Sequence, residues 1–429
     1  MPNQVSFGCL PVPQARGPVA AASGYKTPMP AVWLLSCYWF FALAGLGIFL
    51  PYYSLYLREN AGLPGSQVGL VMATVPLMGI VAPAVWGQVA DLSGQRTRVM
   101  AVLALGTAAG YTALTLPGAF AEFLIATALL AACSTALFPA ATSVSLGIVA
   151  ERRIPFGHVR VWGTVGYLAS VVAFPWALHA FGKQAPPDGP SEPSLGAMFA
   201  SAGALLVVAS GFVLLLPRTG SVALRARRGD LPVLLRNGPY LRVLAITFGA
   251  HLFLRGPMAL FPLYVRAHGG TMDTVSQMWI WMIALEIPLV AGSGTVARRV
   301  SPRGLLVAGV LAGGLRWTLS GLADDLVWVY PAQLLHGLSV TGLIVGAPLC
   351  VDALVPARLR STAQGLLVMI GGSLGGVLSS SSAGWALEHL GADAPALIGG
   401  TGALMVGCLA PLLLPSIGAQ APAGGGRPT

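Results

Sequence analysis

Long apolar segments separated by short polar loops follow one another along the chain from residue 32 to residue 415. Most segments reach the roughly 20 residues that an α-helix needs to cross the hydrocarbon core of a bilayer. The pattern predicts an all-α polytopic membrane protein with twelve transmembrane helices. These helices are expected near residues 32–57, 66–88, 99–117, 122–147, 161–182, 195–217, 240–264, 276–297, 304–322, 326–352, 361–387 and 394–415.

The composition supports a membrane environment and excludes a water-soluble protein. Only 9% of the 429 residues are charged and 55% are hydrophobic, whereas soluble domains carry roughly 25% charged residues. The 55 glycines and 33 prolines fit membrane helices, in which small residues permit close helix contact. The segment 365–391, with glycine pairs and a run of four serines, is expected to pack tightly against another helix.

The basic residues indicate the orientation of the chain. If both termini face the cytoplasm, 19 of the 24 Lys and Arg residues fall on the cytoplasmic side, three fall outside and two fall within spans. An excess of Lys and Arg in cytoplasmic loops is typical of membrane proteins, and it accounts for the net charge of +10 without a nucleic-acid partner. We therefore expect a multi-pass protein of the plasma membrane (the inner membrane in a bacterium) with both termini cytoplasmic.

A basic segment in the middle of the chain divides the predicted helices into two groups of six. It reads RTGSVALRARRGDLPVLLRNG and occupies residues 218–238. Such a division is typical of transporters in which two bundles face each other across a site at the bilayer midplane. The expected parts are a cytoplasmic tail (1–31), a six-helix bundle (32–217), a cytoplasmic linker (218–239), a second six-helix bundle (240–415) and a cytoplasmic tail (416–429).

Three ionisable residues lie near the middle of otherwise apolar spans in the second half of the chain: Glu286, Arg316 and His336. A helical rise of about 1.5 Å per residue places all three near one level of the membrane core. Ionisable side chains at that depth are costly, and by default they mark a substrate or proton pathway. We expect Glu286 to carry a proton, with His336 as relay and Arg316 as their cationic partner. The alternative is a static ion pair that stabilises the bundle.

Further polar candidates lie in the seventh and first predicted spans. His251 and Arg255 are four residues apart in the segment TFGAHLFLRGP, so they share one helix face. Arg255 is a candidate for an anionic substrate group, because a guanidinium can bind a carboxylate through two parallel hydrogen bonds. It is equally a candidate for the resting partner of Glu286. Tyr52 belongs to an aromatic stripe that packs within the bundle or contacts a ring-bearing substrate.

The loop after the second predicted span reads GQVADLSGQRTR and contains Gly87, Asp91, Gly94, Arg96 and Arg98. The spacing matches the G-x-x-x-D-x-x-G-x-R-x-R signature of the major facilitator superfamily, which the chain therefore resembles. The resemblance implies the major facilitator fold and a cytoplasmic gate in this loop. Gly87 would permit close helix approach, and Asp91 is expected to pair with an arginine or a helix N-terminus. An ordinary basic loop would explain the arginines but not the spacing.

The chain from about residue 32 to residue 415 also resembles one branch of that superfamily, the lactose permease and phenylpropionate permease proton symporters. The matching segments are GIFLPYYSLYL, FGHVRVWGTVGY, LRWTLSG and LLHGLSV. The resemblance implies that Glu286, Arg316 and His336 match the charged network that this branch uses for substrate binding and proton coupling. Nucleoside symporters share a related Arg-x-Trp-Gly segment.

The same resemblance implies substrate-binding roles for Arg160 and Tyr167. Arg160 occupies the place of an arginine that binds sugar hydroxyls in the lactose carrier, and Tyr167 the place of a tryptophan that stacks on the sugar ring. Two acidic residues of that carrier are missing, because their places hold Thr142 and Ser339. A complete lactose-type site is therefore not expected. By its position alone, Arg160 is equally well a helix-end cation beside a cytoplasmic loop.

The sequence contains neither the nucleotide-binding motif GxxxxGK[ST] nor the zinc-protease motif HExxH. Its five cysteines have no metal-ligand spacing. We therefore expect a monomeric transporter and not an enzyme, without metal or cofactor, that uses the proton gradient and binds a small solute, protons and the lipid bilayer. Proton symport of an aromatic or carboxylated metabolite is favoured, because Arg255 and Arg316 offer two cations. The alternatives are symport of a sugar or nucleoside, a proton-antiporting efflux carrier, and a non-transporting membrane sensor.

Overall fold

The computed structural model describes residues 29–152, 154–182, 192–217, 230–292 and 299–416. The predicted terminal tails and the linker lie wholly or mostly outside these ranges. Within them the chain forms a helix at each of the twelve predicted places and no strand.

The first half of the described chain contains α1 (Met29–Phe49), α2 (Tyr53–Glu59), α3 (Gly65–Ser93), α4 (Arg96–Ala113), α5 (Phe120–Arg152), α6 (Phe156–Phe181) and α7 (Ala197–Leu214). The second half begins with α8 (Asp230–Leu235), α9 (Gly238–Ala267), α10 (Met272–Ala291), α12 (Pro302–Gly321), α13 (Leu326–Gln333) and α14 (Leu335–Thr341). It continues with the π-helix η1 (Gly342–Gly346), α15 (Ala347–Leu354), the 3-10 helix η2 (Ala357–Leu359), α16 (Arg360–Leu366), the π-helix η3 (Leu367–Leu374), α17 (Gly375–His389) and α18 (Ala394–Leu413).

Ten helices of the described chain are long and apolar enough to cross a membrane, when helical segments that continue one another are taken together. The helices α4 and α10 are not among these ten; α4 begins with Arg96 and Arg98, and α10 contains Asp273 and Glu286. These features confirm the predicted all-α, membrane-spanning architecture.

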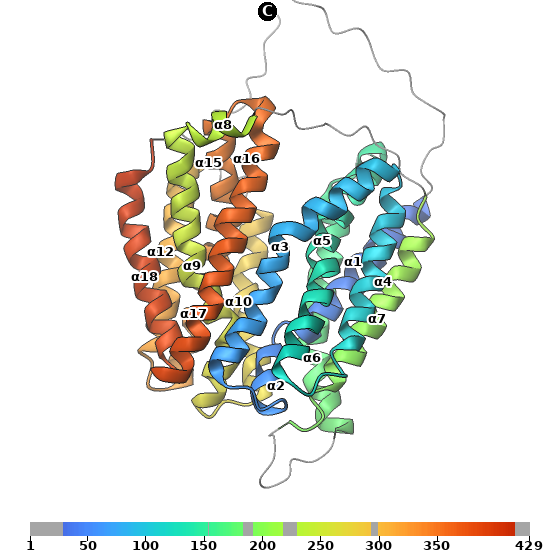
Figure 1. The fold of residues 1–429 in the computed structure, drawn as a ribbon, viewed down its shortest axis with the longest axis vertical. Helices are drawn as coiled ribbons and strands as arrows, with labels where there is room; N and C mark the ends of the chain where they lie inside the picture. Colours follow the sequence, from blue (N-terminus) through green and yellow to red (C-terminus); the bar gives the residue numbers. More distant parts are fainter. Residues whose placement is uncertain (1–28, 153, 183–191, 218–229, 293–298, 417–429) are drawn as a thin grey trace, which may run out of the picture.

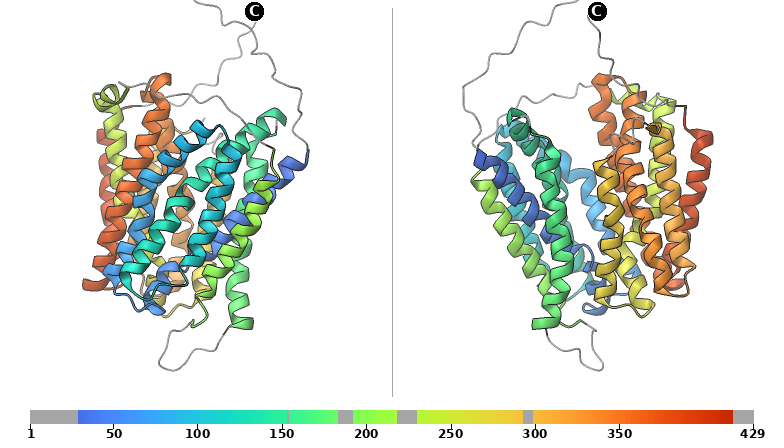
Figure 2. Two further views of the ribbon diagram at one scale, coloured as in Figure 1. Left: turned by 45° about the vertical axis from the view of Figure 1, so that its right-hand side comes forward. Right: turned by 180° about the vertical axis from the view of Figure 1, so that it is seen from behind.

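The helices form two groups that lie side by side, one built from α1 to α7 and the other from α9 to α18 (Figure 1). The groups diverge toward the end that carries α8, which we name the linker end (Figure 2). They approach each other at the opposite end, which we name the closed end. Contacts between the groups join α3 to α17 and η3, α6 to α10, and α2 to α9.

Glycines allow α3 and α17 to touch through their backbones near the closed end. A Cβ atom on Gly69 would lie 2.5 Å from the carbonyl oxygen of Ser380 and 2.7 Å from the Cα of Gly384. A Cβ atom on Gly384 would lie 2.6 Å from the Cα of Gly69. Non-bonded carbon atoms prefer separations of about 3.5–4.0 Å, so this crossing requires glycine. The predicted tight packing of segment 365–391 is confirmed.

Two of the predicted spans are divided into shorter helices beside polar residues. The first span breaks at Pro51 into α1 and α2, because proline has no N–H for the helical ladder and its ring clashes with the preceding turn. This break leaves Tyr52 as the residue that precedes α2. Pro331 lies in α13, which ends at Gln333, and α14 then carries His336 in its first turn.

Candidate functional site

Three helices of the second bundle bring the predicted ionisable residues together in one chain of contacts. Arg316 of α12 donates from Nη1 to Nδ1 of His336 in α14, at 2.9 Å. The other ring nitrogen of His336, Nε2, lies 3.6 Å from Oε2 of Glu286 in α10. Because arginine can only donate, Nδ1 must accept, and a neutral imidazole then carries its hydrogen on Nε2, facing the carboxylate. The order of contacts is therefore Glu286, His336, Arg316.

Uncharged groups bind the rest of the Arg316 guanidinium. Its Nε donates to Oε1 of Gln333 at 2.8 Å, and its Nη2 points at the sulfur atoms of Met282 (3.3 Å) and Met258 (3.6 Å). The ring of Trp317 lies 4.1 Å from the guanidinium carbon, within cation–π range. Only 2% of the Arg316 surface is exposed. Arg316 therefore holds the neighbouring side chains in position, and its guanidinium has no open side for a solute.

Glu286, by contrast, is partly open and reaches across to the first bundle. Its side chain keeps 32% of its surface exposed, and it interacts electrostatically with Arg160 of α6. Arg160 lies over the ring of Trp39 in α1, with its guanidinium carbon 4.8 Å from the ring centroid. The hydroxyl of Tyr38 in α1 also interacts electrostatically with Arg160. Arg160 and Glu286 thus lie within electrostatic range of each other on opposite bundles.

Seven residues further along α6, Tyr167 meets a tryptophan of the second bundle. The ring centroids of Tyr167 and Trp279 of α10 are 6.2 Å apart, and their planes are inclined by 50°. Both side chains are buried, with 8% and 5% of their surfaces exposed. In the described part of the chain, neither the Tyr167 hydroxyl nor the Trp279 Nε1 has a hydrogen-bond partner.

His251 and Arg255 lie on one face of α9, as their spacing predicts. Nδ1 of His251 lies 2.8 Å from the carbonyl oxygen of Thr247, which makes Nδ1 the donor. Arg255 is exposed, and it lies where α9, α17 and α3 meet: a Cβ on Gly376 would lie 3.8 Å from its Cγ and 3.1 Å from Cβ of Pro76. Among the described residues Arg255 has no ion-pair or hydrogen-bond partner, so its predicted pairing with Glu286 is not formed here.

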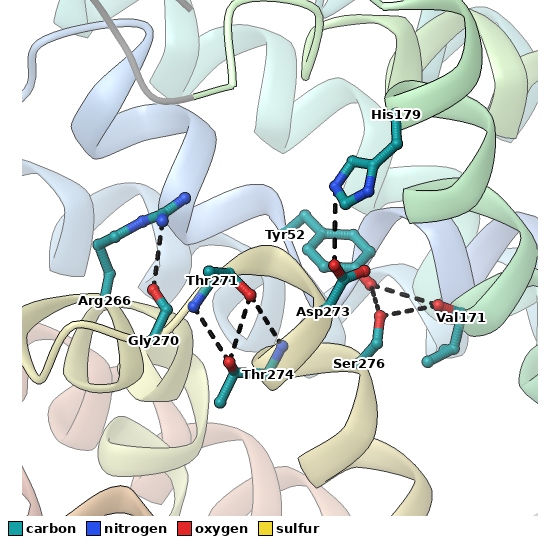
Figure 3. A network of polar contacts seen from close by, with 9 residues as sticks. All are labelled: Tyr52, Val171, His179, Arg266, Gly270, Thr271, Asp273, Thr274 and Ser276. Atoms are coloured by element: carbon teal, nitrogen blue, oxygen red, sulfur yellow. Dashed lines mark hydrogen bonds and ion pairs between the residues drawn. The ribbon is translucent and has the colours of Figure 1, made fainter.

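A buried contact joins the bundles near the closed end (Figure 3). Ser276 of α10 donates to the carbonyl oxygen of Val171 in α6 at 2.9 Å, and the hydroxyl of Tyr52 lies 2.5 Å from the Ser276 hydroxyl. Figure 3 also shows His179 of α6 facing Asp273 of α10, with 3.8 Å between Nε2 and Oδ2. Tyr52 therefore contributes to the contact between bundles in this structure, and its role toward a substrate stays a prediction.

This arrangement of two helical bundles is also found in known proteins. The sequence matches the MFS_1 like family over residues 32–394. The chain belongs to this transporter family. Maltose permease of Geobacillus stearothermophilus is 28% identical over 375 residues, which cover 86% of this chain and 89% of the permease. The probable 3-phenylpropionic acid transporter of Escherichia coli (strain K12) is 24% identical over 357 residues, which cover 80% of this chain and 88% of that transporter.

Solved structures agree with the fold. The crystal structure of nucleoside transporter NupG matches this one with a TM-score of 0.75 at 16% identity, covering 90% of this chain and 97% of that chain. The crystal structure of an auto inhibited POT family peptide transporter matches with a TM-score of 0.70 at 13% identity, covering 92% of this chain and 98% of that chain. The protein is thus a multi-pass membrane transporter of the major facilitator type and not an enzyme, as predicted. The narrower branch resemblance rests on the phenylpropionic acid relative.

The motif for which a cytoplasmic gate is predicted lies at the linker end, between α3 and α4. Oδ1 of Asp91 accepts from Nη2 of Arg96 at 2.8 Å, so the expected pairing with an arginine is formed. Arg98 donates to a side chain of the same turn, and Gly94 ends α3 with a φ of 64°, a left-handed conformation that suits glycine. A Cβ on Gly87 would meet no atom within 4 Å, so the close approach expected there is absent in this structure.

The closed end of the transporter carries a second contact between charged groups. Nε of Arg266 in α9 lies 2.8 Å from Oε1 of Glu59 in α2. Glu192 interacts with both of these residues and with His179. Partial burial raises the pKa of the Glu192 carboxyl, against the opposing attraction of Arg266 and His179. Opposite charges from the two bundles therefore meet where the bundles are closed.

Sequence reasoning missed Gln333, Trp279 and Ser276. Gln333 lies three residues before His336, so both share a face of the interrupted span, and that spacing could have signalled a partner for a buried charge. Trp279 and Ser276 lie seven and ten residues before Glu286, which places them on its side of α10. Their contacts with α6 depend on how the two bundles meet, for which the sequence contains no local signal.

Proposed function

We propose that this transporter takes up a small organic solute together with protons, by alternating access across the plasma membrane. The observation that carries the proposal is the position of Glu286. It lies beside His336 of its own bundle, and it is close enough to Arg160 of the opposite bundle to interact with it electrostatically. A proton gained or lost by Glu286 would therefore change the attraction between the bundles, and this is what coupling requires.

The chain of contacts behind Glu286 favours Glu286 itself as the group that gains and loses the proton. The hydrogen on Nε2 of His336 faces the carboxylate, and Arg316 keeps that tautomer in place by donating to Nδ1. A second proton on His336 would require Nδ1 to give up the bond from Arg316. Protonation of Glu286 therefore leaves these contacts in place, whereas the relay role predicted for His336 would require its bond from Arg316 to break.

The orientation of the transporter in the membrane is argued from the basic residues of the loops. The excess of Lys and Arg lies at the linker end, and such an excess is typical of the cytoplasmic side. The linker end would then face the cytoplasm, and the closed end would face outward. The contacts at the closed end are those that must break before a solute can enter from outside.

The class of solute depends on which cations are free. The sequence favours an aromatic or carboxylated metabolite because of Arg255 and Arg316, but internal partners occupy the guanidinium of Arg316. Arg255 remains for an anionic group. Maltose permease is among the relatives and a nucleoside transporter among the similar structures, so a sugar or nucleoside is the second candidate class.

The test uses purified transporter in proteoliposomes with an imposed proton gradient. Maltose, uridine and 3-phenylpropionate are the probes, and accumulation and gradient-free exchange are measured for wild type and Glu286→Gln. We expect the variant to lose gradient-driven accumulation and to retain exchange, because an amide can bind neighbours but cannot carry the proton. Glu122→Gln is the matched control, since Glu122 caps an exposed turn before α5 and should leave both activities unchanged.

Three results would contradict the proposal. Full accumulation of solute by Glu286→Gln would show that Glu286 does not carry the coupled proton. Proton movement opposite to solute movement would show the antiporting efflux carrier instead. If no solute of the three classes moved and the midplane charges were dispensable for stability and binding, the non-transporting sensor would be favoured.

A further inference from the structure

The helices α3 and α17 come from opposite bundles and touch at two successive levels near the closed end. The first level is the crossing of Gly69 with Gly384 described above. The second level lies four residues further along each helix. There a Cβ atom on Gly65 would lie 3.2 Å from the backbone nitrogen of Glu388 and 3.3 Å from its Cβ. Glu388 therefore lies beside the first residue of α3, where the contact between these helices ends.

The N-terminus of α3 lacks the cap that a helix usually receives from its own chain. The first N–H groups of a helix have no partner within the helix. Ser, Thr, Asp and Asn commonly supply an acceptor from the N-cap position. In α3 this position holds Pro64, whose side chain makes no capping hydrogen bond. The first turn of α3 therefore depends on another part of the protein, or on water, for its hydrogen bonds.

Glu388 supplies the missing acceptor from the other bundle. Its Oε2 accepts a hydrogen bond from the backbone N–H of Ser66, the second residue of α3, at 2.8 Å. That N–H is one of the two that an N-cap side chain normally binds. The negative charge also lies at the end of the helix where the macrodipole is positive. We name this contact between Ser66 and Glu388 the cross-bundle cap.

Two basic residues lie near the cross-bundle cap. Arg58 of α2 and His389 of α17 interact electrostatically with Glu388. Arg58 also donates from Nη1 to the carbonyl oxygen of Leu63 at 3.1 Å, so it holds the short loop that leads from α2 into α3. Because Glu388 is exposed, water and salt weaken its attraction to Arg58. The directional bond to the Ser66 N–H is therefore the contact that positions the carboxylate.

We propose that Glu388 is a gating residue, which holds the closed end shut by capping α3 from the opposite bundle. The inference rests on the alternating access proposed above and not on proton coupling. When the bundles part at this end, α17 carries the carboxylate away from α3, and the Ser66 N–H exchanges a charged acceptor for water. The closed state therefore gains a hydrogen bond and a charge–dipole attraction that the open state lacks. The glycine crossing by itself only permits close approach.

The test measures opening of the closed end without solute or gradient. A cysteine is placed at Ser276 in a protein whose native cysteines are replaced, and its rate of reaction with a maleimide is recorded. Ser276 is buried against Tyr52 and Val171 of the other bundle, so its thiol reacts only when this end opens. Glu388→Ala removes the acceptor but keeps the Cβ that packs beside Gly65, whereas Glu388→Gln keeps a neutral acceptor. The melting temperature of each variant is measured in parallel.

Glu122→Ala is the matched control, because Glu122 performs the same chemistry within one bundle. Its Oε2 accepts from the backbone N–H groups of Gly118 at 2.8 Å and Ala119 at 3.3 Å, just before α5. This substitution therefore removes a cap from a long apolar helix without changing a contact between the bundles.

We expect Glu388→Ala to raise the labelling rate about fivefold, which corresponds to the loss of one helix cap, and Glu388→Gln to raise it less. Glu122→Ala should label at the wild-type rate, although both alanine substitutions should lower the melting temperature. Equal labelling rates in Glu388→Ala and Glu122→Ala would overturn the assignment while leaving proton-coupled transport intact. Absence of labelling in every variant would show that this end does not open, and alternating access would fail with the cap.

A second substitution separates the cross-bundle cap from the attraction of Arg58. Pro64→Ser places a hydroxyl acceptor at the N-cap position of α3, where it can bind the N–H of Ser66 from within the first bundle. In this background Glu388→Ala should raise the labelling rate less than it does in the wild type, because α3 no longer depends on the other bundle for its cap. An undiminished rise would show that the attraction between Glu388 and Arg58 holds this end, and the proposal would be wrong.

Discussion

The glycine contact between α3 and α17 gives a prediction about the conformational equilibrium of the transporter. Gly69→Ala adds one methyl group at the crossing near the closed end. That methyl would lie 2.5 Å from the Ser380 carbonyl oxygen and 2.7 Å from the Cα of Gly384. Because both are backbone atoms, no side-chain rotation can relieve the clash. The two bundles must separate there.

The magnitude follows from these distances. Comfortable contact needs about 3.5–4.0 Å, so the helices must move apart by about 1 Å. Forcing an extra methyl group into a packed contact typically costs about 1–3 kcal/mol. When the two bundles separate at this end, the cost disappears. The substitution should therefore raise the equilibrium constant for opening of the closed end by about 5- to 150-fold.

A reporter cysteine at Ser276 measures this shift in a protein whose native cysteines are replaced. Ser276 is buried against Tyr52 and Val171 of the other bundle, so its thiol can react only when the closed end opens. The labelling rate should rise in Gly69→Ala. Gly211→Ala in α7 is the control, since its methyl would meet no atom within 4 Å and it lies outside the predicted gate. Equal labelling rates in the two variants would refute the reasoning.

Two further predictions concern the charged residues. Arg316→Lys should lower the free energy of unfolding by about 2 kcal/mol, because one ammonium cannot replace the separate bonds to Gln333 and His336; an unchanged melting temperature would contradict this. Arg266→Gln and Glu59→Gln should each speed labelling of the reporter cysteine. In the double variant, the change in the free energy of opening should differ from the sum of the two single changes by about 0.5–1 kcal/mol, as for a partly exposed ion pair. Strictly additive effects would mean that this pair does not hold the closed end.

Much of the site could be anticipated where one helix determines it. His251 and Arg255 share a face of α9 because four residues are about one turn. Asp91 pairs with Arg96 because the turn after α3 returns the chain on itself. The common depth of Glu286, Arg316 and His336 followed from counting residues along apolar spans, and their three helices do bring them into contact.

Contacts between helices could not be anticipated in the same way. The sequence did not indicate that His336 stands between the acid and the arginine, or that Arg316 is enclosed by Gln333 and two methionine sulfurs. Trp279 looked like one more apolar residue of its span. These features depend on the rotation and register of packed helices, to which many residues far apart in the chain contribute.

The sequence by itself determined the twelve helices, because a chain in lipid must satisfy its backbone hydrogen bonds within each apolar segment. It also determined which residues are costly enough in a membrane to suggest function. The tertiary structure alone decided which bundle end is closed, that Arg255 has no ion-pair or hydrogen-bond partner among the described residues, and which side chains of α6 and α10 meet. The physical reason is that helix formation depends on neighbours in the chain, whereas the docking of two bundles depends on the shapes of whole faces.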